Sequence, residues 1–130
     1  MTDGRVAGYE PLVAVLRLCN EVAPQETLLE PQGGNAYRIV WYHPDHGKGC
    51  LKALDRGSGL GLLEPWEACE QSTLFRIEPF GANGSRQYVL RVDGQGCVAI
   101  KGARERSGTA VVMEPCRYER GHVFVIAMAP

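Results

Sequence analysis

The sequence predicts an all-β domain in which a unit of about four short strands occurs three times. Glycine and proline are frequent, with 16 and 8 residues among 130, which favours short elements joined by turns over long helices. Apolar residues make up 45% of the chain, enough for a hydrophobic core. The third observation is an internal repeat of an apolar pair, Glu-Pro, a polar turn and an aromatic residue two positions before Ile.

Three segments carry this repeat. They are TLLEPQGGNAYRI (residues 27–39), GLLEPWEACEQSTLFRI (61–77) and VVMEPCRYERGHVFVI (111–126). Alignment on the Glu-Pro dipeptides makes three aromatic residues equivalent, namely Tyr37, Phe75 and Phe124. A cysteine with apolar residues after it precedes each copy, at Cys19, Cys50 and Cys97.

The segments YRIVWY, LFRIEPF, QYVLRV and VFVIAM are rich in β-branched and aromatic residues and are predicted strands. The clusters DHGKG, DRGSG, GANGS and DGQG separate them as turns, because glycine tolerates positive φ angles. Residues 10–23 also have apolar residues at helical spacing. Since they occupy the place of the first repeat, we expect strands there.

Units of this size cannot each bury a core, so we expect them to close around a common axis with pseudo-threefold symmetry and about twelve strands. The chain is then a single domain over residues 1–130, with repeats at roughly 9–41, 42–82 and 83–130. Tyr37, Phe75 and Phe124 would meet in the core.

The net charge of −1 and pI near 6.3 do not favour nucleic acid as a partner. No apolar run approaches the ~20 residues that span a bilayer, so we expect no membrane insertion. The start MTDGRVAGYE lacks the basic and apolar blocks of a secretory signal. We therefore expect a cytoplasmic protein if Met1 is the native start.

The five cysteines favour a different compartment. Cys50 to Cys69 and Cys97 to Cys116 have the same spacing, and Cys19 is left over. Equal spacings are typical of two homologous disulfides, which would indicate a fragment of a secreted protein. The alternative is that the cysteines are small buried hydrophobic residues in a reducing cytosol.

These motifs together resemble the β-trefoil of the ricin B-chain lectin family. In that family each repeat runs Gly-x-Cys-Leu, a turn, an apolar strand, a second Cys and Gln-x-Trp. The segments GKGCLKAL, GLGLLEPWEAC and TLF follow this order, as do GQGCVAI, SGTAVVMEPC and HVF. The resemblance runs from about Leu12 onward. It implies a β-trefoil, a disulfide within each of the last two repeats, and sugar binding.

The departures from the family pattern imply eroded sugar sites. Gln-x-Trp is replaced by Asn35-x-Tyr37, Thr73-x-Phe75 and His122-x-Phe124. Sugar-binding members have an Asp two residues after the first Cys, where this chain has Glu21, Lys52 and Ala99. Only Glu21 keeps a carboxylate at this position.

Two clusters are candidate sugar sites. Trp66 beside Glu64 and Glu67 would form a glycan platform, because an indole face stacks on pyranose C–H groups and carboxylates accept bonds from hydroxyls. The alternative is a partly buried Trp that caps the barrel. The second cluster joins a carboxylate and two amides, at Glu21, Gln32 and Asn35, and its alternative is a solvated turn.

The segment WYHPDHGKG is expected to be a mobile recognition loop that presents Trp41 and Tyr42. His43 and His46 could supply two metal ligands, but the sequence offers no third partner, so we expect no metal site. Another cluster is basic: Lys101, Arg104, Arg106, Arg117 and Arg120. Interleaved glutamates make it either a solvated face or a patch for an acidic partner.

The sequence therefore predicts a binding module that is neither an enzyme nor dependent on a cofactor. The first hypothesis is a lectin-like module that recognises a glycan. The alternative is a protein-binding β-trefoil, either a protease inhibitor or an intracellular interaction module.

Overall fold

The structure, a computed structural model, describes residues 1–16, 27–82 and 84–126, and over these it is all-β. Eleven strands are present in this part of the chain, against about twelve expected for the whole. The strands are β1 (Thr2–Val6), β2 (Tyr9–Val15), β3 (Thr27–Pro31), β4 (Ala36–His43), β5 (Gly47–Ala53), β6 (Leu63–Trp66), β7 (Phe75–Pro79), β8 (Gln87–Val92), β9 (Gly96–Ile100), β10 (Val111–Glu114) and β11 (Val123–Val125). Three short 3₁₀ turns complete it, η1 (Cys69–Gln71), η2 (Lys101–Ala103) and η3 (Arg120–His122). The ambiguous segment begins as strand β2, and its residues 17–23 lie outside the described residues.

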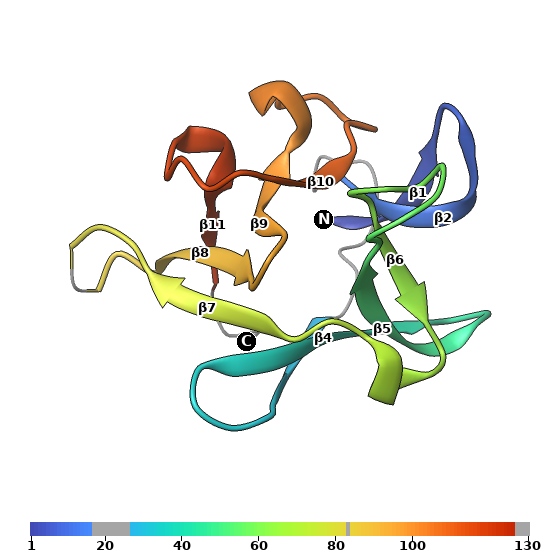
Figure 1. Ribbon diagram of the computed structural model, residues 1–130, viewed down its shortest axis with the longest axis horizontal. Helices are drawn as coiled ribbons and strands as arrows, with labels where there is room; N and C mark the ends of the chain where they lie inside the picture. The colour runs from blue at the N-terminus through green and yellow to red at the C-terminus, as the bar shows by residue number, and fades with distance from the viewer. Residues whose placement is uncertain (17–26, 83, 127–130) are drawn as a thin grey trace.

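Nine strands form one nearly closed, barrel-like sheet in the order β10-β9-β8-β7-β4-β5-β6, with β11 paired to β8 and β3 paired to β4. The β1–β2 hairpin is a separate sheet that lies beside β6 and β10 (Figure 1). Isolated bridges from Val15 to Ala110 and from Leu62 to Val112 help to join these parts. In the described part of the chain, no helix is long and apolar enough to cross a membrane.

The same run of elements occurs twice in the last two thirds of the chain. β4, β5, β6, η1 and β7 are followed by β8, β9, β10, η3 and β11. In each run the first strand pairs with the second and with the last, and the second strand pairs with the third. β3 pairs with β4 as β7 pairs with β8. The expected boundary after residue 41 falls inside β4.

The strand register corrects the alignment of the three Glu-Pro dipeptides. Glu30-Pro31 lies opposite Arg38 and Tyr37 on the strand that follows it, and Glu78-Pro79 has the same relation to β8. Glu30-Pro31 is therefore the counterpart of Glu78-Pro79, which the alignment did not use. The other two Glu-Pro dipeptides are offset by two residues, because Cys50 faces Trp66 whereas Cys97 faces Glu114. The Glu-Pro dipeptide therefore recurs at different positions of a repeated hairpin, and the three copies are not structurally equivalent.

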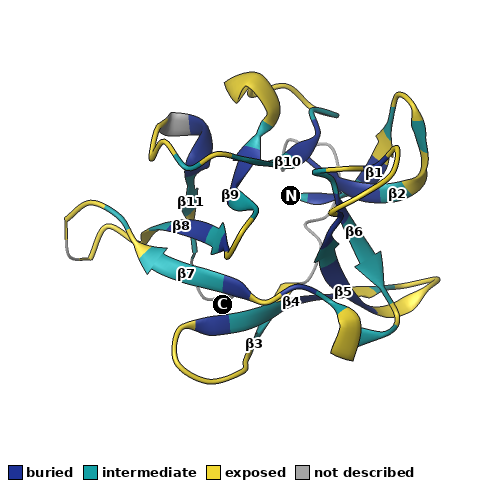
Figure 2. Ribbon diagram, in the orientation of Figure 1, coloured by how far each residue is buried: buried dark blue, intermediate teal, exposed yellow. Residues whose placement is uncertain are grey.

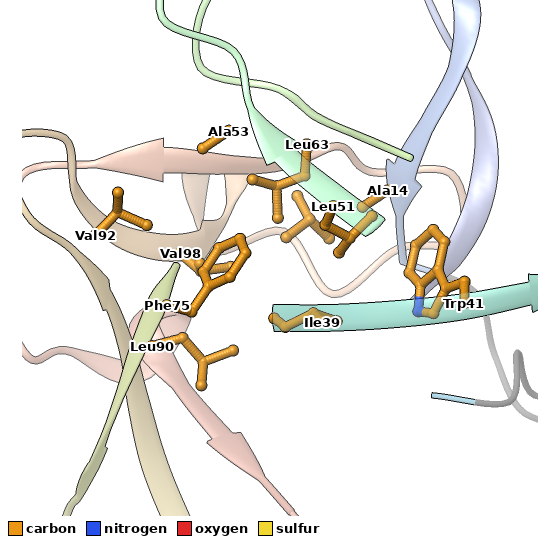
Figure 3. Close-up of a cluster of buried hydrophobic side chains, with 11 residues drawn as sticks. Ala14, Ile39, Trp41, Leu51, Ala53, Leu63, Phe75, Leu90, Val92 and Val98 are labelled. Atoms are coloured by element: carbon orange, nitrogen blue, oxygen red, sulfur yellow. The ribbon is translucent and has the colours of Figure 1, made fainter. Parts of the chain in front are cut away.

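The start of β7 is buried (Figure 2), and Phe75, its first residue, is fully buried, as expected for a core aromatic residue. Figure 3 shows its ring among Ile39, Leu90 and Val98. Phe124 packs against this cluster and is partly buried. Tyr37 was wrongly expected in the core, since it is only partly buried and outside the cluster. It lies opposite Phe75, as Tyr88 lies opposite Phe124, so it is a cross-strand neighbour and not an equivalent residue.

Disulfides join Cys50 to Cys69 and Cys97 to Cys116, the pairing that the family resemblance implies. Each bridge ties the second strand of its run to the segment that precedes the last strand. Cys50 and Cys97 are also fully buried, so these residues serve as core and as cross-link together. Cys19 lies outside the described residues.

Candidate functional site

A cleft of about 270 Å³ opens between the β1–β2 hairpin, the β4–β5 hairpin and β6. We call it the β6 cleft. Its lining includes Asp3, Trp41, His43, Lys48, Glu64 and Glu67. It brings together three of the predicted site residues, Trp41, Glu64 and Glu67, although the sequence assigned them to two different clusters.

Glu64 is held in place by two donors on different parts of the chain. Its Oε2 atom accepts a hydrogen bond from the Tyr9 hydroxyl at 3.0 Å and another from Trp66 Nε1 at 3.1 Å. Its Oε1 atom has no partner among the described residues. The carboxylate is therefore oriented by the protein, with one oxygen left to accept from a ligand.

The contact with Glu64 also changes the pKa of Tyr9. Burial and, next, the hydrogen bond to the Glu64 carboxylate raise the pKa of the Tyr9 hydroxyl above its ordinary value of 10.0. The phenol therefore stays protonated, and remains a donor to Glu64, over the physiological pH range. Tyr9 comes from β2 and Glu64 from β6, so the contact also joins the hairpin to the barrel sheet.

Trp66 orients Glu64 and does not line the cleft. It is partly buried, and the ammonium of Lys52 lies 5.4 Å from the centre of its ring. A cation at this distance from an indole face is attracted to it, so the lysine already occupies that face. The geometry thus gives Trp66 a positioning role and Glu64 the ligand-facing one.

The expected recognition loop is a β-hairpin, and only one of its two aromatic residues is exposed. Trp41 is 2% exposed, packs in the core and donates from Nε1 to Thr27 Oγ1 at 3.0 Å. Ile39, Val40 and Trp41 are all buried, so both faces of β4 are covered here, and exposure begins only at Tyr42, which is 46% exposed. The expectation of an exposed Trp41 was wrong for this reason, although the residue still borders the cleft.

His43 closes the hairpin turn. Its Nδ1 atom accepts from the backbone N–H groups of Asp45 and His46, at 3.0 and 3.2 Å. Because Nδ1 is an acceptor, the ring proton is on Nε2, which lies 3.2 Å from Asp3 Oδ2. The imidazole therefore fixes the rim of the cleft, and both of its nitrogens are occupied by protein groups.

The second predicted cluster is not assembled by the described residues. Gln32 and Asn35 are exposed in the turn after β3. Gln32 donates to Glu30 at 3.2 Å, and Asn35 accepts from Arg76 at 3.0 Å. Glu21 lies outside the described residues. The two amides are therefore engaged with separate charged neighbours.

Thr73 and His122, which lie two residues before Phe75 and Phe124, have a structural role. Thr73 Oγ1 accepts from the backbone N–H of Ala53 at 2.8 Å, and both residues are buried. His122 is fully buried and its Nδ1 atom accepts from the backbone N–H of Arg117 at 3.2 Å. Thr73 therefore satisfies a backbone donor of a buried residue, and His122 accepts from the exposed segment after Cys116.

Among the described residues, one group has the donor types of a metal site, namely Glu114, Glu119 and His122. Glu114 lies 3.1 Å from His122 Nε2 and 3.6 Å from Arg117, and Arg117 also lies 3.3 Å from Glu119. The carboxylates thus already face positive or donor groups of the protein. We interpret the group as an ion-pair cluster. The disulfide cysteines also have no free thiolate for nucleophilic chemistry.

Sequence reasoning did not place Asp3 or His43 at the cleft, nor Tyr9 as the donor that holds Glu64. Asp3, Tyr9 and His43 come from β1, β2 and β4, and only His43 among them was singled out from the sequence, as a possible metal ligand. No family model and no curated protein sequence matches the chain.

Proposed function

We propose that the chain is a non-catalytic β-trefoil of the ricin B-chain type that binds a carbohydrate in the β6 cleft. The fold part of this proposal is supported by the two matching runs of four strands and by β3–β4, which repeats the β7–β8 pairing. A disulfide at the same place in each run supports it further. The two disulfides also suit an oxidising compartment, so we propose a secreted or otherwise exported location.

The observation that carries the binding proposal is the orientation of Glu64. The family places its sugar-binding carboxylate at the position of Lys52, and Glu64 lies directly opposite Lys52 in the strand register. The cross-strand neighbour therefore supplies the lost carboxylate. Glu67, exposed beside the same cleft, adds a second acceptor for sugar hydroxyls.

The remaining walls fit a sugar ring. Pro11, Leu12 and Pro65 line the cleft and present apolar surface for pyranose C–H groups, while Lys48 adds a donor. A cleft of about 270 Å³ is at the small end of ligand sites, which suits one monosaccharide unit. Such a site binds weakly, with a dissociation constant on the order of millimolar, near −4 kcal/mol.

The test is a titration of galactose, glucose and N-acetylglucosamine, followed by chemical shifts of the backbone amides. Wild type should show saturable shifts at Glu64 and around the β4–β5 hairpin. Glu64→Gln removes a charge-assisted hydrogen bond worth ~1.5–3 kcal/mol and should abolish measurable binding. Trp66→Phe removes the donor that orients Glu64 and should weaken binding less.

The matched control is Glu70→Gln, an exposed glutamate in η1 that does not line the cleft. It should bind like wild type. Saturable sugar binding that survives Glu64→Gln would refute the site, and failure to bind any of these sugars or a broad glycan array would refute the lectin proposal.

The second candidate is a protein-binding β-trefoil, either a protease inhibitor or an intracellular interaction module. One observation favours it: Leu60 is 65% exposed at the edge of a second, larger groove. A large apolar side chain held in water beside a groove is typical of a contact surface.

A further inference from the structure

A second groove, of about 620 Å³, lies between the β1–β2 turn, the loop before β6, and the segment from η2 to β10. We call it the basic groove. The lining residues used here are Arg5, Leu60, Leu62, Lys101, Arg104 and Met113. It shares no lining residue with the β6 cleft, so its role is separate from the proposed sugar site.

The groove carries three cations that no described acid neutralises. Arg5, Lys101 and Arg104 are all exposed. The Arg5 guanidinium donates to the carbonyl oxygen of Glu10, which is a neutral group. The side chains of Lys101 and Arg104 have no ion-pair or hydrogen-bond partner among the described residues. Their charges are therefore available to a ligand.

Glu114 is the one acidic residue in the lining, and its carboxylate already has protein partners. Its Oε1 atom lies 3.1 Å from His122 Nε2 and 3.6 Å from Arg117 Nη2, and neither His122 nor Arg117 lines the groove. The lining therefore has three cations against one carboxylate, so its formal charge is positive, although the whole chain carries a formal net charge of −1.

Apolar side chains lie beside these cations. Leu60 is 65% exposed, and Leu62 and Met113 are partly buried in the walls. Phosphate groups would gain nothing from an exposed leucine. A peptide that carries both carboxylates and an apolar side chain would use the leucine and the cations together.

The walls are fixed in advance of binding. The Met113 N–H donates to the Gly61 carbonyl at 2.7 Å, and Leu62 bridges to Val112. This ties the loop before β6 to β10. Because these backbone groups are already paired, a ligand is recognised through side chains and not by adding a strand.

We propose that the basic groove binds an acidic peptide segment of a partner protein. An apolar side chain of the peptide packs on Leu60 and Met113, and its carboxylates contact Arg5, Lys101 and Arg104. The recognition combines electrostatic and apolar contacts, so salt weakens it without abolishing it.

The probe is a short fluorescent peptide, Glu-Asp-Leu-Phe-Asp-Glu, blocked at both ends, with binding followed by anisotropy. Two companion peptides test its parts: one has Gln and Asn in place of the acids, and one has Ser-Ser in place of Leu-Phe. Both should bind at least about tenfold more weakly than the probe. Affinity should fall severalfold between about 50 and about 300 mM salt.

Arg104→Glu and Leu60→Ser should each weaken the probe by roughly three- to tenfold. Both positions are exposed, so the variants should keep the wild-type thermal melt, which is measured alongside. The matched control is Arg86→Glu, an exposed arginine in the β7–β8 loop outside the groove, and it should leave binding unchanged.

Equal weakening by Arg86→Glu would reduce the effect to overall charge and overturn the proposal. The same follows if the Ser-Ser peptide, or polyphosphate of matched charge, binds as tightly as the probe, because the groove would then be a simple anion site. Sugar titrations on the same variants keep this result distinct from the test of the β6 cleft.

Discussion

Replacing Thr73 by valine should destabilise the fold through one buried backbone group. Thr73 lies just before β7, is 7% exposed, and accepts a hydrogen bond on Oγ1 from the Ala53 N–H at 2.8 Å. Its own N–H donates to the Leu51 carbonyl at 3.1 Å, so it links the start of β7 to the end of β5. Valine has nearly the same shape but cannot accept the bond.

The expected loss of stability comes from the backbone donor that Thr73→Val leaves without a partner. Thr73→Val leaves the Ala53 N–H buried and without a partner, because Ala53 is only 1% exposed. An unsatisfied buried donor costs about 1–3 kcal/mol, and the added methyl group recovers little because the site is already packed. We expect the free energy of unfolding to fall by about that amount. Thr73→Ser, which keeps the hydroxyl, should lose less than half as much.

Urea unfolding with the disulfides intact measures this difference. The slope of the free energy against urea should stay constant, so that a shift in midpoint reports native-state stability alone. A loss within about 0.5 kcal/mol for Thr73→Val, or equal losses for the valine and serine variants, would show that the hydroxyl does not satisfy the backbone donor as described.

Phe75→Ala should cost about 3–5 kcal/mol because it opens a cavity in the core, and a urea midpoint near wild type would contradict this. Mass spectrometry after alkylation of the native protein should find both disulfides intact, each worth about 3 kcal/mol by loop entropy; five alkylated thiols would contradict the pairing. Because the pKa of Tyr9 is raised in the folded state, the contribution of Tyr9 to stability is complete below pH 10.0 and declines as the pH rises through the folded-state pKa. Wild type should therefore lose stability in that alkaline range relative to Tyr9→Phe. Parallel stability profiles of the two proteins against pH would contradict this prediction. Hydrogen bonds from Arg76 and then Arg91 lower the pKa of Asp93 below 3.8. The contribution of Asp93 to stability is therefore complete above pH 3.8 and is lost as the pH falls further. Asp93→Asn should flatten the acid limb of the curve of stability against pH.

The strands and turns were predictable because their signals are local. Runs such as YRIVWY and QYVLRV formed β4 and β8, and the DHGKG cluster formed the β4–β5 turn, where Gly47 has a φ of 73° that other residues adopt poorly. The repeat was recognised, but its register was not. A short string such as Glu-Pro suits the end of more than one strand of a hairpin, and only the strand pairing shows which positions are equivalent.

The candidate site was predicted in part, and the missing part is non-local. Glu64, Glu67 and Trp66 are neighbours in the sequence, so their grouping needed no fold. Tyr9 is 55 residues from Glu64, and nothing in either segment indicates that they meet. The burial of Trp41 was accessible from the run Ile39-Val40-Trp41, because consecutive apolar residues are typical of a strand that is covered on both faces. The loop prediction gave more weight to the turn residues than to this pattern.

The strand register explains why the repeat supports one β6 cleft and not a second. Lys52 faces Glu64 on β6, while its counterpart two residues after Cys97, Ala99, faces Val112 on β10. Valine has no acceptor for a sugar hydroxyl, and Ala99 is fully buried. The position of Trp66 is taken by Glu114, which His122 and Arg117 engage. Changing one strand therefore removes the proposed site without disturbing the pairing that repeats the fold.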